Sequence, residues 1–276
     1  MAERYKLSEE FKKQNILDLI HHISDTIIRP NFKNPDNIVR EKTSPQDLQT
    51  EADIKSEQAF YAELPKILPG SVVLGEEEVD SNPDVLDRLK LRDTPVWVVD
   101  PIDGTRNFAQ GRPIFGLMVA LVFNQKATHG WIYDIPGDRM AMAQAGQGAS
   151  LNGESLTLSV QESTWENLSG FALRTRAVKD IEARHGKMDL KSLGCAAHEY
   201  LALATGQRDF SIYKQIKPWD HLAGTLILTE AGGVSQHWDG SVYSPVRKDG
   251  GLVNAREKTT IEKIRSTLNP EKAGLT

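Results

Sequence analysis

The stretch Asp100-Pro101-Ile102-Asp103-Gly104-Thr105 follows directly on the apolar run Val96-Trp97-Val98-Val99. The apolar run predicts a buried strand, and the acids at the end of such a strand point toward one place. Pro101 fixes the backbone there, and Gly104 permits a conformation or a close approach that a side chain would block. Two ionised carboxylates so placed repel each other unless a cation lies between them. The segment therefore predicts a cation site at the end of a buried strand.

The ligand types in this segment indicate the kind of cation. Oxygen ligands alone select hard cations, so we expect Mg²⁺, with Mn²⁺ as the alternative. Zinc is disfavoured, because the 7 histidines show no H-x-x-x-H spacing. Cys195 is interpreted as a small core residue of an alanine-rich helix. Gly104-Thr105 can offer backbone N–H groups to an anion if a short helix begins there, and an ordinary turn is the alternative.

Three further places bring acids to the end of a predicted strand or the start of a predicted helix. Asp53 stands at capping-box spacing from Thr50, and a cap alone would also explain it. Glu76 and Glu77 follow a short apolar run, with a solvated loop as the alternative. Asp220 stands at a helix start, where the helix dipole by itself stabilises an acid. None is diagnostic alone, but with the two acids of the opening segment they predict one shared site.

Bulk properties exclude several other classes of protein. A chain of 276 residues forms one large domain or two closely packed lobes. The net charge of -5, without a long basic block, gives no reason to expect nucleic acid as a ligand. No apolar run approaches the roughly 20 residues that span a membrane, and the start of the chain lacks the apolar core of a signal peptide. The single cysteine suits a reducing compartment, so we expect a cytoplasmic protein. Walker, G-x-G-x-x-G and G-x-S-x-G motifs are absent from the sequence, which disfavours a kinase, a dinucleotide oxidoreductase and a serine hydrolase.

Hydrophobic periodicity predicts a β-meander in the middle of the chain and alternating strands and helices after about Leu168. The best lobe boundary is Leu158–Trp165, Ser81–Asp93 is expected to be a surface excursion, and Asn152-Gly153 is a strong turn signal. The expected helices are Ser8–Arg29, Thr50–Leu64, Ala196–Ala204, Trp219–Ala231 and Glu257–Leu268. The expected strands are Val72–Leu74, Val96–Val99, Leu117–Phe123, Trp131–Ile135, Met140–Ala145, Arg208–Tyr213 and Leu252–Val253.

Four segments in a fixed order carry a resemblance to a known family. They are Lys42–Asp53, Gly75-Glu76-Glu77, Trp97–Phe108, and Trp219–Gly224 running into Glu230–Gly233. In these segments the chain resembles the inositol monophosphatase family of Mg²⁺-dependent, typically lithium-sensitive phosphatases. The resemblance extends from the first helix almost to the C-terminus, and three motifs in the right order make a chance similarity hard to sustain.

The resemblance implies an α/β (α+β) fold, a layered α-β-α-β-α sandwich with the active site between two lobes. It implies a single domain over residues 1–276, with lobes at about 1–160 and 161–276, and it suggests a homodimer. The implied activity is hydrolysis of a small phosphorylated metabolite, such as inositol monophosphate or a similar sugar or polyol phosphate. The apolar strand Leu117–Phe123 is interpreted as core rather than interface.

The resemblance also implies roles for individual residues. The ligands of two or three Mg²⁺ ions would be Glu76, Asp100, the carbonyl oxygen of Ile102, Asp103 and Asp220. Gly104 and Thr105 would hold the phosphate through their backbone amides.

The nucleophilic water would be oriented and activated by Asp53 and Thr105, with Glu76, and supported by Glu77 and Lys42. Such chemistry agrees with first principles. Paired metal ions about 3.5–4 Å apart can activate water, neutralise phosphoryl oxygens and stabilise the leaving group, so no covalent phosphoenzyme is needed.

Substrate choice is where the chain departs from the family pattern. Inositol-specific members carry a glutamate seven residues before the C-terminal aspartate, and Tyr213 stands there in this sequence, followed by Lys214 and Lys217. A strand-end aromatic without a role is the alternative for Tyr213. Arg106 replaces a small residue or lysine and either reaches the phosphate or pairs with a surface acid. Tyr213, Arg106 and Lys214 are therefore the candidates for substrate selectivity.

These departures keep other substrates open, namely histidinol phosphate and a 3′(2′),5′-bisphosphate nucleotide. Lys214, Lys217, Arg174 and Arg176 could meet a second anionic group, with solvation at the surface as the alternative for each. A hypothesis of another class is a non-catalytic protein- or RNA-binding regulator built on the same fold. The intact set of acids argues against it, because a scaffold gains nothing from closely spaced acids around one cavity.

Overall fold

The structure is a computed structural model, and it describes residues 9–33, 38–41, 48–159, 164–172, 179, 182–183, 185–247 and 249–267. Its helices are α1 (Glu9–Ile23), the π-helical η2 (Ser24–Ile28), α2 (Arg29–Asn31), α3 (Glu51–Ile67), α4 (Glu76–Ser81), the 3₁₀ segments η4 (Pro83–Lys90) and η5 (Trp165–Asn167), α5 (Thr105–Ala109), α7 (Ala196–Ala204), α8 (Pro218–Glu230) and α9 (Lys258–Thr267). Its strands are β1 (Ile38–Glu41), β2 (Leu48–Thr50), β3 (Val72–Gly75), β4 (Val96–Asp103), β5 (Gly116–Phe123), β6 (Lys126–Asp134), β7 (Arg139–Gln144), β8 (Gly148–Leu151), β9 (Glu154–Leu156), β10 (Ser169–Phe171), β11 (Asp189–Lys191), β12 (Phe210–Tyr213), β13 (Val234–His237) and β14 (Leu252–Ala255).

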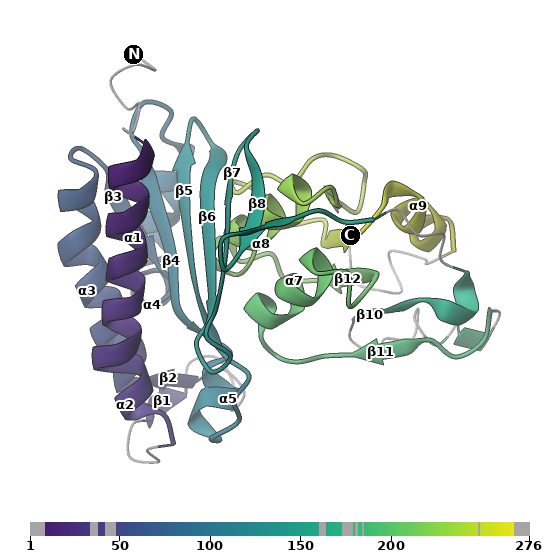
Figure 1. The fold of residues 1–276 in the computed structure, drawn as a ribbon, viewed down its shortest axis with the longest axis horizontal. Coiled ribbons are helices and arrows are strands. Elements are labelled where there is room, and N and C mark those ends of the chain that lie inside the picture. The colour runs from purple at the N-terminus through teal and green to yellow at the C-terminus, as the bar shows by residue number, and fades with distance from the viewer. Residues whose placement is uncertain are drawn as a thin grey trace.

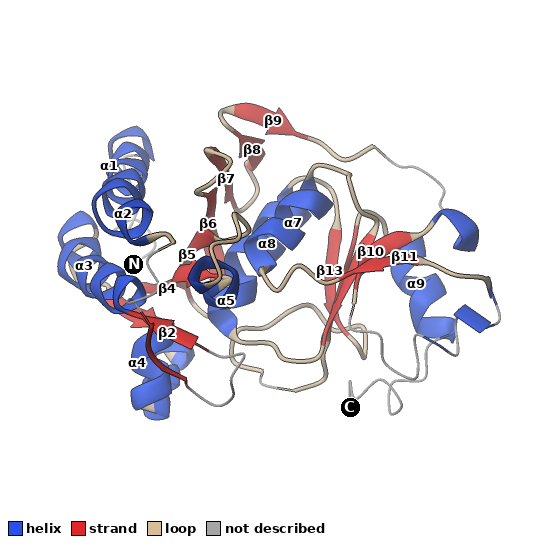
Figure 2. Cartoon of the chain, turned by 90° about the horizontal axis from the view of Figure 1, so that it is seen from below, coloured by secondary structure: helices blue, strands red, loops and turns tan. Residues whose placement is uncertain are grey.

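The elements stack in five layers, which confirms the predicted sandwich (Figure 2). Helices α1 and α3 cover one face of a 7-stranded sheet of order β3-β4-β5-β6-β7-β8-β9 (Figure 1). In this sheet β3 and β4 pair in parallel, and all other neighbouring strands are antiparallel. Helices α7 and α8 form the middle layer. A 5-stranded sheet of order β11-β10-β12-β14-β13 follows, with α9 on its far face. The two sheets lie on either side of the sequence segment proposed as the lobe boundary.

Strand β4 is buried along its whole length, which explains its continuous apolar run. Val96 and Val98 pack on the side of α7 and α8, whereas Trp97 and Val99 pack on the side of α1 and α3. Because side chains alternate along a strand, the next residue, Asp100, points toward the middle layer. The alternation alone thus directs an acid from β4 toward α8.

A β-bulge at the end of β4 sends the second acid to the same side. Asp100 pairs with Met118 and Asp103 pairs with Gly116, so β4 carries one residue more than β5 over this interval. The extra residue shifts the alternation, so that Ile102 joins the core under α1 and α3 while Asp103 reaches α7. Without the bulge, two acids three residues apart would face opposite sides of the sheet.

Several local expectations are confirmed. Thr50 and Asp53 form the predicted capping box at the start of α3, and Asn152 and Gly153 adopt φ of 49° and 85° in the predicted turn. The meander strands and α7 also form, and β5 is buried as expected of a core strand.

Other expectations were wrong in detail. Helix α3 continues through Pro65 to Ile67, beyond the predicted end at Leu64. The acidic run after β3 is not a solvated loop but the start of α4, with Glu77 buried. The surface excursion contains η4, which buries Val85 and Leu89. Across the part of the chain that the structure describes, no helix combines the length and the apolar character that a membrane span requires.

Candidate active site

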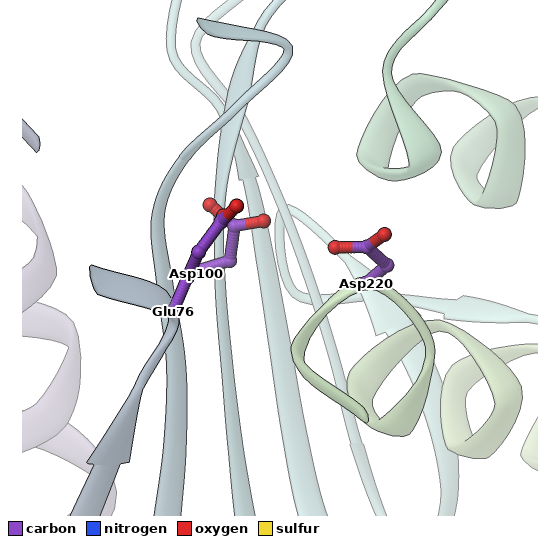
Figure 3. A group of neighbouring side chains, drawn as sticks. All are labelled: Glu76, Asp100 and Asp220. Atoms are coloured by element: carbon purple, nitrogen blue, oxygen red, sulfur yellow. The ribbon is translucent and has the colours of Figure 1, made fainter. Parts of the chain in front are cut away.

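Three of the predicted acids meet between the two sheets. Glu76 begins α4, Asp100 lies in β4 and Asp220 lies in the first turn of α8. Each offers one carboxylate oxygen, and these oxygens lie within 4.8 Å of one another. Figure 3 shows Glu76 and Asp100 side by side on one wall, with the Asp220 carboxylate facing them from α8. The three elements are far apart in the sequence, so only the fold brings these acids together.

The electrostatics of this group favour a cation. Asp100 is 1% exposed, and its Oδ1 atom has no hydrogen-bond partner among the described residues. Burial, and then the charge of Glu76, raises the pKa of Asp100 well above its usual range, and the same two causes raise the pKa of Asp220. A buried carboxylate oxygen without a partner is costly, and a hard cation would satisfy all three acids. The residues therefore fit Mg²⁺.

The Asp103 carboxylate is engaged elsewhere. Its Oδ2 atom accepts hydrogen bonds from the backbone N–H of Ala197 at 2.5 Å and from the thiol of Cys195 at 3.0 Å, so it caps the start of α7. Burial raises the pKa of Asp103, and these hydrogen bonds oppose the rise. Cys195 is buried as expected, but it is the N-cap of α7 rather than a residue within the helix. Its thiol contacts a candidate ligand, a contact that the core interpretation missed.

Asp53 and Thr105 lie together, as the resemblance implied. The Thr105 hydroxyl is 3.3 Å from Asp53 Oδ1 and 2.9 Å from the carbonyl oxygen of Ile102. The other oxygen of Asp53 accepts from the backbone N–H of Thr50 at 2.8 Å. Burial and the charge of Glu77 raise the pKa of Asp53 to about 8, against the opposing effect of the bonds from Thr50. The cap and the contact with Thr105 coexist, because each uses a different oxygen.

Gly104 precedes α5 in a conformation that demands glycine. Its φ is 87°, and an added Cβ would lie 2.9 Å from the carbonyl oxygen of Ile114. As the N-cap of α5, Gly104 offers no side chain to bond the first amides of that helix, which begins at Thr105. The short helix that an anion-binding turn requires is therefore present.

Two further side chains support the group of three acids. Buried Glu77 accepts a hydrogen bond from the side-chain amide of Gln49. The Lys217 ammonium lies 3.5 Å from Glu76 Oε1 and also lowers the pKa of Asp220, against the stronger effects of burial and Glu76. Lys217, proposed as a contact for a second anion, thus stands beside the acids themselves.

Glu76, Asp103 and Asp220 line a cavity of about 910 Å³. The rest of its lining includes Phe171, Ser192, Ile212, Lys214, Lys217, Glu199 and Tyr213, and the part formed by Glu199 and Tyr213 is called the far end below. The Tyr213 hydroxyl donates to Glu199 Oε2 at 2.7 Å, while Glu199 Oε1 accepts from the backbone N–H of Leu193 at 2.9 Å. Burial raises the pKa of Glu199 to about 7.

Not every predicted residue reaches this cavity. The predicted residues that are not among those lining it are Asp53, Glu77, Asp100, Ile102, Gly104 and Thr105. Arg106 is exposed on α5 and is not among the lining residues either. Lys42, Arg174 and Arg176 lie outside the described residues.

Among the described residues, sequence reasoning missed three buried acids, Glu57, Asp134 and Glu199. Glu57 accepts hydrogen bonds from the backbone amides of Glu77 and Glu78. The signal available in the sequence was an acid on an otherwise apolar helix face, since Asp53, Glu57, Phe60 and Leu64 are all buried along α3. Glu199 likewise interrupts the mainly apolar helix α7.

Acids converging beside a helix start, in a layered α/β fold, are typical of phosphatases that use metal ions. The model of the inositol monophosphatase family matches residues 17–272 of this chain. Inositol monophosphatase 1 of Homo sapiens is 32% identical over 247 residues, covering 86% of this chain and 87% of the relative. The chain belongs to the inositol monophosphatase family.

Two further relatives agree with this assignment. The fructose-1,6-bisphosphatase/inositol-1-monophosphatase of Thermotoga maritima is 30% identical over 240 residues, covering 86% of this chain and 89% of the relative. The solved structure of a Thermotoga maritima IMPase has a TM-score of 0.77 at 25% identity and covers 92% of this chain and 96% of that chain. The protein is therefore a phosphoric monoester hydrolase, which confirms the prediction of an enzyme rather than a binding protein.

Proposed function

We propose that this phosphatase hydrolyses a small phosphorylated polyol or sugar in a Mg²⁺-dependent reaction, by direct attack of an activated water. The observation that carries the proposal is the buried Asp100 carboxylate. One of its oxygens has no hydrogen-bond partner among the described residues, and one lies within 4.8 Å of carboxylate oxygens of Glu76 and Asp220. These three carboxylates would hold one cation, and Asp103 and the Ile102 carbonyl would complete a set for two or three ions. When bound, Mg²⁺ would neutralise phosphoryl oxygens and favour ionisation of the attacking water.

The chain's own residues supply orientation. The first amides of α5, at Gly104 and Thr105, would receive the phosphate, since no side chain caps that helix. Asp53 and Thr105, which contact each other, would together hold the attacking water, and Asp53 Oδ1 would accept its proton. The raised pKa of Asp53, about 8, suits a proton acceptor near neutral pH. Glu77 and Lys42 would support this wall of the site.

The far end of the cavity favours a polyol over a second phosphate. With Tyr213 donating to Glu199, the lone pairs left on both side chains accept hydrogen bonds. Hydroxyl groups of a polyol can donate to them, whereas a second phosphate would bring further acceptors. An amino alcohol such as histidinol also donates, so histidinol phosphate is the second candidate, and a bisphosphate nucleotide is disfavoured by this pair.

We also propose a cytoplasmic homodimer. The single cysteine supports a reducing compartment, and the family resemblance supports the dimer. Light scattering would measure the molar mass of the purified protein in solution and so test the dimer. A monomer at micromolar concentration would refute it.

Phosphate release from a substrate panel, with Mg²⁺ and with EDTA, tests the proposed reaction. The panel contains inositol 1-phosphate, fructose 1,6-bisphosphate, histidinol phosphate and 3′-phosphoadenosine 5′-phosphate. We expect turnover only with Mg²⁺ and the highest kcat/KM for inositol 1-phosphate. Equal turnover in EDTA would refute the metal dependence, and a preference for 3′-phosphoadenosine 5′-phosphate would refute the polyol assignment.

A further inference from the structure

Helix α4, which begins with the candidate ligand Glu76, is held at its start by side chains of another helix. Glu57 of α3 is 6% exposed, and its Oε2 and Oε1 atoms accept hydrogen bonds of 2.8 Å from the backbone N–H groups of Glu77 and Glu78. One turn further along α3, the Tyr61 hydroxyl accepts from the N–H of Gly75 at 3.1 Å. A helix start leaves its first amides without partners inside the helix, so α3 supplies the cap that α4 lacks.

Gly75, the N-cap of α4, leaves the space that this cap occupies. An added Cβ at Gly75 would lie 2.2 Å from both Cδ and Oε2 of Glu57. The backbone at Gly75 is extended, with φ −112° and ψ 158°, a conformation that any residue can adopt. Glycine is therefore required here by the Glu57 carboxylate and not by the backbone. Gly75 and Glu57 form a complementary pair.

The cap places Glu57 beside other acids. Such a position is electrostatically unfavourable for a side chain that makes no compensating hydrogen bonds. Burial and the charges of Glu77 and Glu76 raise the pKa of Glu57 to about 7, while the hydrogen bonds from the two backbone amides oppose the rise. Glu57 is not among the residues that line the cavity. It accepts its two hydrogen bonds from the backbone N–H groups of the residues that immediately follow Glu76.

The Glu78 side chain is a second attachment of α4. The Glu78 carboxylate pairs with the guanidinium of Arg88 and accepts a hydrogen bond from Tyr61. Loss of Glu57 would therefore remove the acceptor of the Glu77 and Glu78 backbone amides, while the Glu78 side chain and the Tyr61–Gly75 hydrogen bond still hold the helix. The expected consequence is a misplaced Glu76 carboxylate more than a melted helix.

We infer that Glu57 is a positioning residue, which sets Glu76 as a cation ligand by capping α4 from α3, with Gly75 as its required partner. This role rests on the proposed Mg²⁺ dependence. It predicts that Mg²⁺ binding is more sensitive to Glu57 than overall stability is, because the cap orients one ligand of a shared site.

Calorimetric titration of the full chain with Mg²⁺ alone tests the inference without substrate. Glu57→Ala should weaken Mg²⁺ binding by at least about tenfold, the effect of losing a buried charged hydrogen-bonding group. Glu57→Gln should do the same while preserving volume, because its amide NH₂ would oppose one of the two backbone N–H groups. Glu63→Gln is the matched control, since Glu63 lies on the same helix and pairs with Lys66 at the surface. Thermal unfolding in EDTA identifies any variant that fails to fold.

Gly75→Ala tests the pairing. Alone, it should displace the Glu57 carboxylate and weaken Mg²⁺ binding by about tenfold. Added to Glu57→Ala, it should change affinity by less than about twofold, because the carboxylate it would strike is gone. Wild-type Mg²⁺ affinity in both folded Glu57 variants, or a double variant roughly 100-fold weaker than wild type, would overturn the inference. A wild-type protein that binds no Mg²⁺ would overturn the proposed function, and this inference with it.

Discussion

The acid end of the site, formed by Glu76, Asp100 and Asp220, differs from the far end, formed by Tyr213 and Glu199, in how buried oxygen atoms are satisfied. At the acid end, Asp100 Oδ1 has no hydrogen-bond partner among the described residues, and three carboxylates face one another. At the far end, each oxygen of Glu199 accepts a hydrogen bond, one from Tyr213 and one from the backbone of Leu193. The acid end is incomplete without a cation, whereas the far end is satisfied without a ligand. The first should govern catalysis and the second selectivity.

A substitution at Asp100 is the strongest test of the difference between the acid end and the far end. Asp100→Asn removes the most buried charge of the acidic group while keeping its shape. We expect Mg²⁺-dependent phosphatase activity to fall by about 10³-fold, equivalent to about 4 kcal/mol of transition-state stabilisation. The melting temperature in EDTA should stay the same or rise, because the substitution removes a buried carboxylate that lies beside the Glu76 and Asp220 carboxylates. Full activity in a purified, folded Asp100→Asn sample would refute the metal assignment.

The acid end should also control stability as the pH changes. The pKa of Asp53 is about 8 in the native protein and near 3.8 in the unfolded chain. Between these values the native state holds a proton that the unfolded chain has released, so metal-free stability should fall as the pH rises from about 4 to 8, on the order of a few kcal/mol. Melting curves in EDTA across pH 5–8 measure the slope. Asp53→Asn should make the slope less steep without abolishing it, because the pKa values of Glu57, Glu199, Asp100 and Asp220 are raised too. An unchanged slope in this variant would contradict the raised pKa of Asp53.

The two ends differ equally in how far the sequence predicts them. Local signals in the sequence predict the acid end, namely an apolar strand followed by a proline and two acids, and alternation along β4 then directs Asp100 toward α8. The bulge that also turns Asp103 toward α7 was not predicted. The far end depends on packing between β12 and α7, where Glu199 meets Tyr213 across 14 residues of sequence. No local pattern specifies that contact. Helix α4 was missed for the same reason, since its cap comes from α3 and the segment has no apolar periodicity.

Tyr213→Phe breaks the far end selectively. It removes the hydroxyl that donates to Glu199, so a polyol loses one acceptor and meets a displaced carboxylate. We expect kcat/KM for inositol 1-phosphate to fall about tenfold relative to that for p-nitrophenyl phosphate, which carries no hydroxyl groups. Tyr243→Phe is the matched control, because the Tyr243 hydroxyl is buried without a partner among the described residues. A Tyr213→Phe selectivity ratio equal to that of the control would assign Tyr213 to packing alone.

Arg106 should give the smallest effect, and it separates two hypotheses about the phosphate. Its side chain is exposed on α5, the helix whose first amides would hold the phosphate. The charge of an exposed side chain is screened by water and salt. We therefore expect Arg106→Ala to change kcat/KM by less than about twofold at 0.15 M salt. A loss of tenfold or more, equal for inositol 1-phosphate and p-nitrophenyl phosphate, would show that Arg106 swings onto the phosphate. In that case the Arg106 guanidinium would be a positively charged group of the acid end.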